Sequence, residues 1–208
     1  GLRIESKYFV KLLRDPVAGN MIRSLFINKQ SADKLRARPK GIEKSKVTNL
    51  GMLGAGMMGS GIALVSAQAG INVVLLDSTI ESATKGKEYT EKYLEKSIAL
   101  KKITSEKAKA IIDRIHITTD FNDLKDCDLI IEAVFENREI KADVTEKTEK
   151  VIADSVIFAS NTSTLPITGL AKASSRPKSF IGMHFFSPVE RMPLVEIIMG
   201  EESSDEAL

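Results

Sequence analysis

Two side chains near the end of the chain have the types and spacing of a proton-transfer pair. His184 follows the apolar run 180–183, and Glu196 lies inside a second apolar run, 193–198. A glutamate in such a strand is expected to be buried, and a buried carboxylate is costly unless it finds a donor. If the two runs form neighbouring strands, Glu196 can hold one imidazole nitrogen and leave the other to act as a base. A purely structural His–Glu contact is the alternative, and a substrate site beside the pair would favour proton transfer.

A glycine cluster earlier in the chain predicts a binding site for a dinucleotide. The apolar run that starts at Val47 leads into the pattern Gly-x-Gly-x-x-Gly over 54–59, and a helix is expected over 62–69. Gly54 permits a tight turn, Gly56 lets a pyrophosphate approach the backbone, and Gly59 lets the helix lie close to the strand. The N–H groups at the start of that helix are then available to the phosphates.

Asp77 indicates which dinucleotide is bound. It closes the apolar run 71–76, about 20 residues past the glycines, where a carboxylate can accept hydrogen bonds from the adenosine ribose hydroxyls. Ser78 and Thr79 follow, and neither can neutralise a 2′-phosphate. The sequence therefore predicts NAD rather than NADP, and a surface carboxylate that merely ends a strand is the alternative.

Polar side chains also follow two later apolar runs. Glu136 lies near the end of the run 128–137, and four small polar residues, 161–164, follow the run 156–160. Because ligands bind beyond the carboxyl ends of parallel strands, both stretches are expected to line the cofactor crevice. Helix capping by Ser163 or its neighbour Thr164 is a structural alternative that is compatible with a place in the site.

The order of the elements predicts an α/β fold of the Rossmann type, a doubly wound, mostly parallel sheet with flanking helices. Apolar runs that indicate strands alternate with stretches that indicate helices. Thr79 is placed to cap a long polar helix through about Leu100, and a shorter helix is expected over 105–112. His116 alternates with isoleucines in a short strand and is expected to face solvent, so no catalytic role is predicted for it.

Composition limits the classes of protein that the chain can belong to. Its 208 residues are 43% hydrophobic, enough for one ordinary domain with an appendage. With 30 basic and 28 acidic residues the formal net charge is +2, which gives no reason to expect nucleic acid as a partner. The single cysteine, Cys127, excludes an internal disulfide, and with only two histidines no metal site is predicted. No run approaches the roughly 20 apolar residues of a membrane span and no secretory signal is evident, so a soluble intracellular protein is expected.

The start of the chain is not expected to belong to the dinucleotide domain, because the first strand begins only at about Val47. Apolar residues at helical spacing on either side of Asp15-Pro16 predict two short amphipathic helices. A basic run then leads into the core, and it indicates a solvated linker, with a phosphate-binding patch as the alternative. We therefore expect a helical linker over 1–45 and a dinucleotide-binding domain over 46–208.

Together these stretches resemble the L-3-hydroxyacyl-CoA dehydrogenases of fatty-acid β-oxidation. The resemblance covers about 46–208 and rests on stretches in the family's order and spacing, namely 54–63, 132–137, 160–163, 184–188 and 194–196. Residues 1–45 further resemble the segment that connects the enoyl-CoA hydratase and dehydrogenase parts of the bifunctional β-oxidation enzyme. The resemblance implies that the chain is a piece of such a protein, without the family's all-helical C-terminal domain.

The resemblance implies NAD-dependent oxidation of (S)-3-hydroxyacyl-CoA to 3-oxoacyl-CoA. His184 would be the base that takes the 3-hydroxyl proton, Glu196 would orient it, and Ser163 would hydrogen-bond the substrate oxygen. The residues implied to contact NAD or the bound pair are Gly54, Gly56, Met58, Gly59, Asp77, Val134, Phe135, Glu136, Lys141 and Ser187. Ser187 departs from the asparagine common in many relatives, and an ordinary surface lysine is the alternative for Lys141.

The resemblance also implies partners, a location and rival functions. A thiolase subunit is a candidate partner of the full-length enzyme, and bacterial cytoplasm is favoured, with peroxisome and mitochondrion as alternatives. Because the helical domain supplies a further asparagine and part of the substrate pocket, this chain alone is expected to bind NAD with little or no turnover. Two rivals stay open: another NAD-linked hydroxyacid dehydrogenase, in which a lysine base is expected, and a non-catalytic dinucleotide-binding or structural relative.

Overall fold

A computed structural model describes residues 1–208 and divides them into two compact units, Gly1–Ile42 and Glu43–Leu208. The first unit is helical, with α1 (Leu2–Leu13), α2 (Pro16–Ile22), a π-helical stretch (Arg23–Asn28) and α3 (Lys29–Asp33). Asp15 caps α2, because its Oδ1 accepts a hydrogen bond from the Val17 N–H at 2.8 Å. Helices on both sides of Asp15-Pro16 are therefore confirmed, and the second continues without a break to Asp33.

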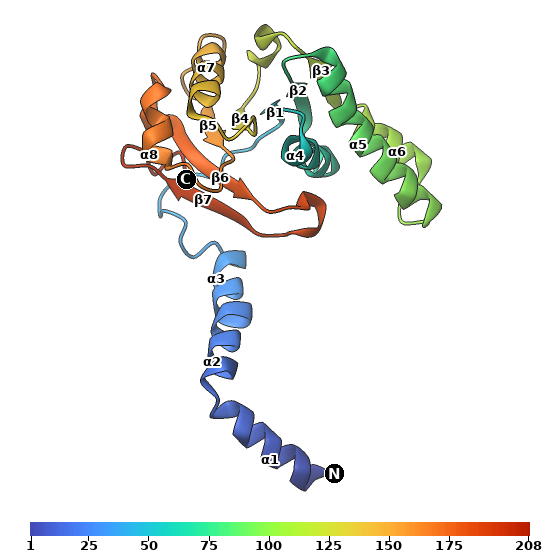
Figure 1. Cartoon of the computed structure of the whole chain (residues 1–208), viewed down its shortest axis with the longest axis vertical. Coiled ribbons are helices and arrows are strands. Elements are labelled where there is room, and N and C mark those ends of the chain that lie inside the picture. The colour runs from blue at the N-terminus through green and yellow to red at the C-terminus, as the bar shows by residue number, and fades with distance from the viewer. The chain divides into compact units, whose positions relative to one another are not determined.

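The second unit is built on one seven-stranded sheet with the order β3-β2-β1-β4-β5-β6-β7 (Figure 1). The strands are β1 (Asn49–Leu53), β2 (Asn72–Leu76), β3 (Ile115–Thr118), β4 (Leu129–Glu132), β5 (Ile157–Ser160), β6 (Phe180–Phe185) and β7 (Val195–Met199). Every pair is parallel except β6 and β7, which run antiparallel. Six strands thus follow the order of a Rossmann sheet, and the predicted fold is confirmed.

Helices cover both faces of this sheet. The helices α4 (Met57–Gln68), α5 (Ile80–Ala99) and α6 (Ser105–Ile112) lie on one face, and α7 (Arg138–Glu149) and α8 (Ile167–Leu170) lie on the other (Figure 1). Successive strand residues enter opposite apolar clusters: Met52 belongs to one together with Ile62, and Leu53 belongs to the other together with Phe158. Burial on both faces explains why the central strands are almost continuously apolar in sequence.

The local signals for helices are borne out, whereas one strand is shorter than predicted. Thr79 caps α5 by accepting a hydrogen bond from the Ser82 N–H at 3.2 Å, and His116 in β3 is exposed. The strand expected over 128–137 ends at Glu132, because the chain then turns and the side chain of Asn137 caps α7. This early end opens a loop, 133–137, at the carboxyl edge of the sheet. None of the helices combines the length and the apolar character needed to cross a membrane.

Candidate active site

The turn between β1 and α4 is shaped by two glycines that no other residue could replace without movement. Gly54 has φ +93, and a Cβ there would lie 2.7 Å from the carbonyl oxygen of Ala133. A Cβ on Gly59 would lie 1.8 Å from the carbonyl oxygen of Gly54. Because those oxygens belong to the backbone, neither clash could be relieved by a side-chain rotation. The two glycines let strand, turn and helix approach one another closely.

The same turn leaves room and donors for a diphosphate. A Cβ on Gly56 would meet no atom within 4 Å, so this glycine borders open space. The hydrogen bond from the Ser60 N–H to the Gly56 carbonyl is 2.9 Å long. The N–H groups of Met57, Met58 and Gly59 precede it and have no acceptor inside the helix. Open space beside unpaired N–H groups at a helix N-terminus fits the diphosphate of NAD.

Asp77 ties the end of β2 to this turn. Its Oδ2 accepts a hydrogen bond from the Ala55 N–H at 2.7 Å, and its Oδ1 accepts one from the Ser78 N–H at 2.7 Å. The carboxylate is only half-buried, and two oxygens can accept more than these bonds. Asp77 therefore has acceptor capacity left for a ribose hydroxyl next to the glycine turn.

His184 and Glu196 lie directly opposite each other on β6 and β7. The His184 Nδ1 is 2.9 Å from the Glu196 Oε2, and the His184 Nε2 is 3.2 Å from the Ser163 Oγ. A carboxylate at Nδ1 favours the tautomer that carries its proton there, which leaves Nε2 as an acceptor. The three predicted catalytic side chains thus form one line of contacts, Glu196–His184–Ser163, in which the basic Nε2 of His184 faces Ser163.

The expectation that Glu196 is buried is wrong. Its side chain is 51% exposed, and that of His184 is 17% exposed. The reason is the position of β7 at the edge of the sheet, where an apolar sequence does not guarantee cover. The Glu196 carboxylate therefore pairs with His184 while it keeps contact with solvent.

The buried glutamate of this fold is Glu132, to which the sequence reasoning gave no role. Glu132 ends β4 with a side chain 1% exposed, and Lys141 on α7 is 2% exposed. The Lys141 Nζ lies 2.8 and 3.0 Å from the two carboxylate oxygens, which also accept bonds from the Val134 N–H and the Ser160 hydroxyl, both at 2.7 Å. An acidic residue in a buried strand, followed by a lysine in the first turns of the next helix, was the signal that could have identified this pair.

Glu136 connects the buried pair to the loop that carries Ser163. It lies 3.4 Å from the Lys141 Nζ and accepts hydrogen bonds from the Thr162 hydroxyl and from the N–H groups of Ser163 and Thr164, at 3.2 and 3.4 Å for the latter two. Burial alone would raise the pKa of Glu136, but the hydrogen bond from Thr162, the charge of Lys141 and the backbone N–H groups outweigh it and lower the pKa. Glu136 is therefore held as a carboxylate.

These hydrogen bonds also define what Ser163 can do. The backbone N–H groups of Ser163 and Thr164 donate their hydrogen bonds to Glu136. They therefore do not form an oxyanion hole, whose N–H groups would face a substrate carbonyl. The line of Ser163, His184 and Glu196 therefore fits a hydroxyl that donates to a substrate oxygen, not a nucleophile. Helix capping by Ser163 or Thr164 is wrong, because α8 has Pro166 at its N-cap position and no side chain caps it.

The connection between β6 and β7 contacts the first turns of α4. Ser187 is exposed, with its Oγ 3.9 Å from the Met57 sulfur, and Val189 packs against Gly61, where an added Cβ would come within 3.0 Å of it. Three further residues predicted to contact NAD are accessible: Val134 and Met58 are half-buried and Phe135 is 81% exposed. The contacts predicted between NAD and these residues, and Lys141, stay predictions.

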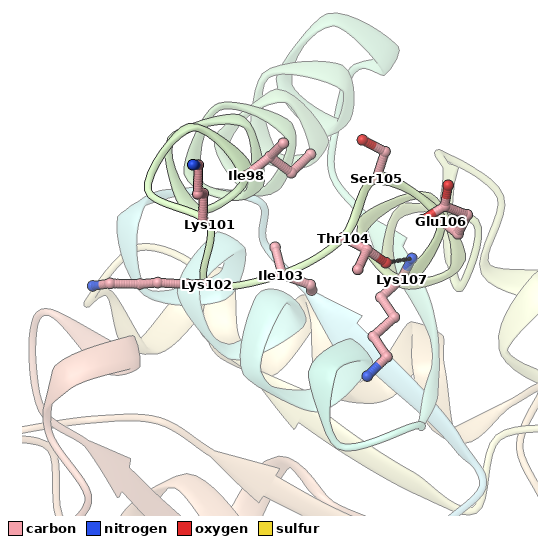
Figure 2. Close-up of a pocket in the computed structure, with 8 residues that line it drawn as sticks. All are labelled: Ile98, Lys101, Lys102, Ile103, Thr104, Ser105, Glu106 and Lys107. Carbon is pink, nitrogen blue, oxygen red and sulfur yellow. Dashed lines mark hydrogen bonds between the residues drawn. The ribbon is translucent and has the colours of Figure 1, made fainter.

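A separate hollow of about 490 Å³ lies at the turn between α5 and α6 (Figure 2). It is lined by Ile98, Lys101, Lys102, Ile103, Thr104, Ser105, Glu106 and Lys107, and the Thr104 Oγ1 caps α6 by accepting a bond from the Lys107 N–H at 3.3 Å. None of the predicted site residues is among them. The hollow is a feature of two polar helices and not of the site at the carboxyl edge of the sheet.

Comparison with known proteins agrees with this geometry. Residues 49–208 match the family model described as 3-hydroxyacyl-CoA dehydrogenase, NAD binding domain. The fatty acid oxidation complex subunit alpha of Psychrobacter sp. (strain PRwf-1) is 39% identical over 207 residues, which is 100% of this chain and 28% of that protein. The chain thus spans little more than a quarter of the length of such curated relatives.

Solved structures of hydroxyacyl-CoA dehydrogenases share the fold. The crystal structure of (S)-3-hydroxybutyryl-CoA dehydrogenase from Ralstonia eutropha has a TM-score of 0.76 and 40% identity, covering 78% of this chain and 57% of that one. The dehydrogenase part of multifunctional enzyme 1 from C. elegans has a TM-score of 0.71 and 29% identity, covering 80% and 38%. The family match over 49–208 agrees with the glycine turn and with the carboxylate at the end of β2. The chain therefore belongs to the 3-hydroxyacyl-CoA dehydrogenase family and contains the NAD-binding domain of that family.

Proposed function

We propose that this chain supplies the NAD site and the proton-transfer pair for oxidation of (S)-3-hydroxyacyl-CoA to 3-oxoacyl-CoA in fatty-acid β-oxidation. The observation that carries the proposal is the line of Ser163, His184 and Glu196, with contacts of 3.2 and 2.9 Å. It lies at the carboxyl edge of a sheet whose first turn fits a diphosphate. Ligands of open α/β sheets bind at that edge.

Each residue of the line has one task in this proposal. NAD, when bound, accepts a hydride from C3 of the substrate. The His184 Nε2 takes the proton of the 3-hydroxyl group, and the Ser163 hydroxyl donates a hydrogen bond to the same oxygen. Glu196 holds the Nδ1–H and stabilises the imidazolium that forms, because an ionised carboxylate strengthens a hydrogen bond to a cation.

The residues around the turn hold the cofactor. The start of α4 binds the diphosphate and Asp77 binds the adenosine ribose, while Ser187 approaches from the β6–β7 hairpin. Val134, Phe135, Glu136 and Met58 border the nicotinamide end of the crevice. Lys141 holds the carboxylate of Glu136 in place, since its ammonium group lies 3.4 Å from it.

The names of the relatives support a wider context for the whole protein. Relatives are alpha subunits of a fatty acid oxidation complex, and the match includes the helical unit Gly1–Ile42. Beyond what those names say, and on the resemblance described above, we infer that residues 1–45 connect to an enoyl-CoA hydratase part, that a thiolase subunit is a partner, and that the protein acts in bacterial cytoplasm.

We further infer that the 208-residue chain binds NAD but oxidises substrate slowly. The Glu196 side chain is 51% exposed, and electrostatic stabilisation of a developing charge is weaker where water has access. We expect fewer than about one turnover per second, below the usual range of enzymes.

Two measurements test the proposal. Calorimetric titration should show one NAD site per chain, and NADH with acetoacetyl-CoA should give slow oxidation of NADH that His184→Ala lowers by about 10²-fold or more without loss of NAD binding. Absence of NAD binding would overturn the proposed function. NAD binding with no turnover at all would favour a non-catalytic relative, and a turnover that His184→Ala leaves unchanged would favour a dehydrogenase with another base. Fast turnover by this chain would refute the inference of slow oxidation.

A further inference from the structure

We propose that the buried pair of Glu132 and Lys141 positions the proton-transfer residues. In this role Lys141 holds two loops at once, and those loops place Ser163 and the end of β6 that carries His184. The inference rests on the proposed function, because it assigns a task to residues that the reaction itself does not touch. In this role Glu132 and Lys141 are positioning residues, and the NAD contact predicted for Lys141 is a separate task.

The first connection from the pair to the site runs through Glu136. The Lys141 Nζ lies 3.4 Å from one Glu136 oxygen, and the other oxygen accepts the Ser163 N–H at 3.2 Å. The Ser163 Oγ in turn lies 3.2 Å from the His184 Nε2. The charge of one ammonium therefore fixes the carboxylate to which the backbone of Ser163 is bound.

The second connection runs through Asn161. Lys141 donates a hydrogen bond to the Asn161 carbonyl at 3.3 Å, and the Asn161 N–H donates one to the Glu132 carbonyl at 2.6 Å. The Asn161 side-chain oxygen accepts the N–H of Phe185 at 3.0 Å. Phe185 directly follows His184, so this chain of bonds fixes the strand at the residue that carries the base.

The N–H donors of the Lys141 ammonium group are all used by oxygens of the protein. An ammonium has three N–H donors, and four oxygens of Glu132, Glu136 and Asn161 lie within 3.4 Å of this one. With the side chain 2% exposed, Lys141 is linked to Ser163 and His184 through the groups it holds. A buried pair adds little net stability over apolar replacements of similar size, so its use here is better explained by the geometry that it imposes on the two loops.

The two histidines of the chain give a direct readout of this geometry. With only His116 and His184 present, an imidazole ¹⁵N spectrum contains two rings, and His116→Gln assigns them. The test variant is the double change Glu132→Gln, Lys141→Met, which removes both charges and leaves neither partner buried alone. The control is Asp143→Asn, Lys147→Met, which removes an exposed ion pair, 2.6 Å long, from the same helix.

If the pair positions the site, the double variant folds by circular dichroism but the His184 Nε2 resonance shifts and the preference for the Nδ1–H tautomer weakens. The His116 resonances stay unchanged, and the control alters neither ring. If the double variant folds, the wild type binds NAD and the His184 resonances do not move, the inference is wrong while the proposed function stands. If the wild type does not bind NAD, the proposed function fails independently of this result.

Two further variants decide the matter even if the double variant fails to fold. Glu136→Gln cuts the first connection and Asn161→Ala cuts the second, and neither changes the buried pair. Each should shift the His184 Nε2 resonance. Unchanged His184 resonances in both folded variants would refute the proposal, because then neither loop transmits the position of Lys141 to the base.

Discussion

Gly59 lies so close to the carbonyl oxygen of Gly54 that an added Cβ would come within 1.8 Å of it, whereas a Cβ on Gly56 would meet nothing within 4 Å. The same motif therefore contains a glycine that the fold requires and a glycine whose Cβ the fold would tolerate, so the proposed role of Gly56 is in binding. This difference separates the contribution of the turn to stability from its contribution to binding.

We expect Gly59→Ala to lower the free energy of unfolding by about 1–3 kcal/mol, the usual cost of overpacking, since the clash is with backbone. Gly56→Ala should leave the unfolding midpoint nearly unchanged and weaken NAD binding by about tenfold or more, because its Cβ would enter the space for the diphosphate. Urea unfolding and calorimetry measure the two effects. Equal losses of stability in both variants would contradict this division.

Glu196→Gln should lower the rate of acetoacetyl-CoA reduction by about tenfold or more and leave NAD affinity unchanged. The amide keeps the shape of the side chain but lacks the charge that stabilises the imidazolium, and its NH₂ group can donate to Nδ1 and select the wrong tautomer. A single-turnover experiment at excess chain, followed by NADH absorbance, measures the rate. A rate like that of the wild type would show that the contact at 2.9 Å is only structural.

The sequence was sufficient to predict the sheet, because strands that are buried on both faces are recognisable as continuous apolar runs. Glycine and threonine residues in addition marked the turns and the helix caps. It also predicted that His184 and Glu196 meet if their two apolar runs form neighbouring strands, and β6 and β7 do pair there. It could not give the exposure of Glu196, because an apolar run does not reveal whether a strand is at an edge.

The pair of Glu132 and Lys141 was missed for a different reason. A charged residue is assumed to be at the surface unless its partner is known, and this partner lies on another element whose orientation only the packed structure supplies. The hydrogen bonds from Glu136 to the loop 162–164 depend on the same packing. Residue types at the ends of strands therefore predicted where the site lies, but not which side chains support it.

Asp77→Ala should weaken NAD binding by about 10- to 100-fold, in the range for loss of hydrogen bonds to a charged group. Part of the loss is expected to come from the turn itself, because the Asp77 Oδ2 holds the Ala55 N–H at 2.7 Å. The double change Asp77→Ala, Ser78→Arg should in addition improve NADP binding relative to NAD. Calorimetry with both cofactors tests this, with Asp143→Ala as a surface control, and an unchanged NAD affinity in Asp77→Ala would contradict the assignment.

The lowered pKa of Glu136 predicts a pH-dependent contribution to stability. Because the folded protein favours the carboxylate, this contribution is present above the ordinary value of 4.5 and is lost as the pH falls through the lower folded value. The difference in unfolding free energy between wild type and Glu136→Gln should therefore shrink on acidification from about pH 6 to pH 3. Asp128, whose pKa is also lowered by bonds from Thr48 and Asn49, is present in both proteins, so its effect cancels. A difference that stays constant over this range would be inconsistent with the prediction.

Cys127 should report on opening of the domain. The thiol is 4% exposed, and burial together with the charges of Asp128 and Asp126 raises its pKa to about 12, so at neutral pH almost no reactive thiolate is present. Labelling by iodoacetamide should be slow in the native chain, rise with urea in parallel with unfolding, and slow further when NAD is added, because a ligand that binds only the folded state suppresses opening. Mass spectrometry follows the reaction and Cys127→Ser serves as the unreactive control. Labelling at the rate of a free thiol without urea would contradict the buried placement, and a native rate that NAD does not slow would count against a site built on the same domain.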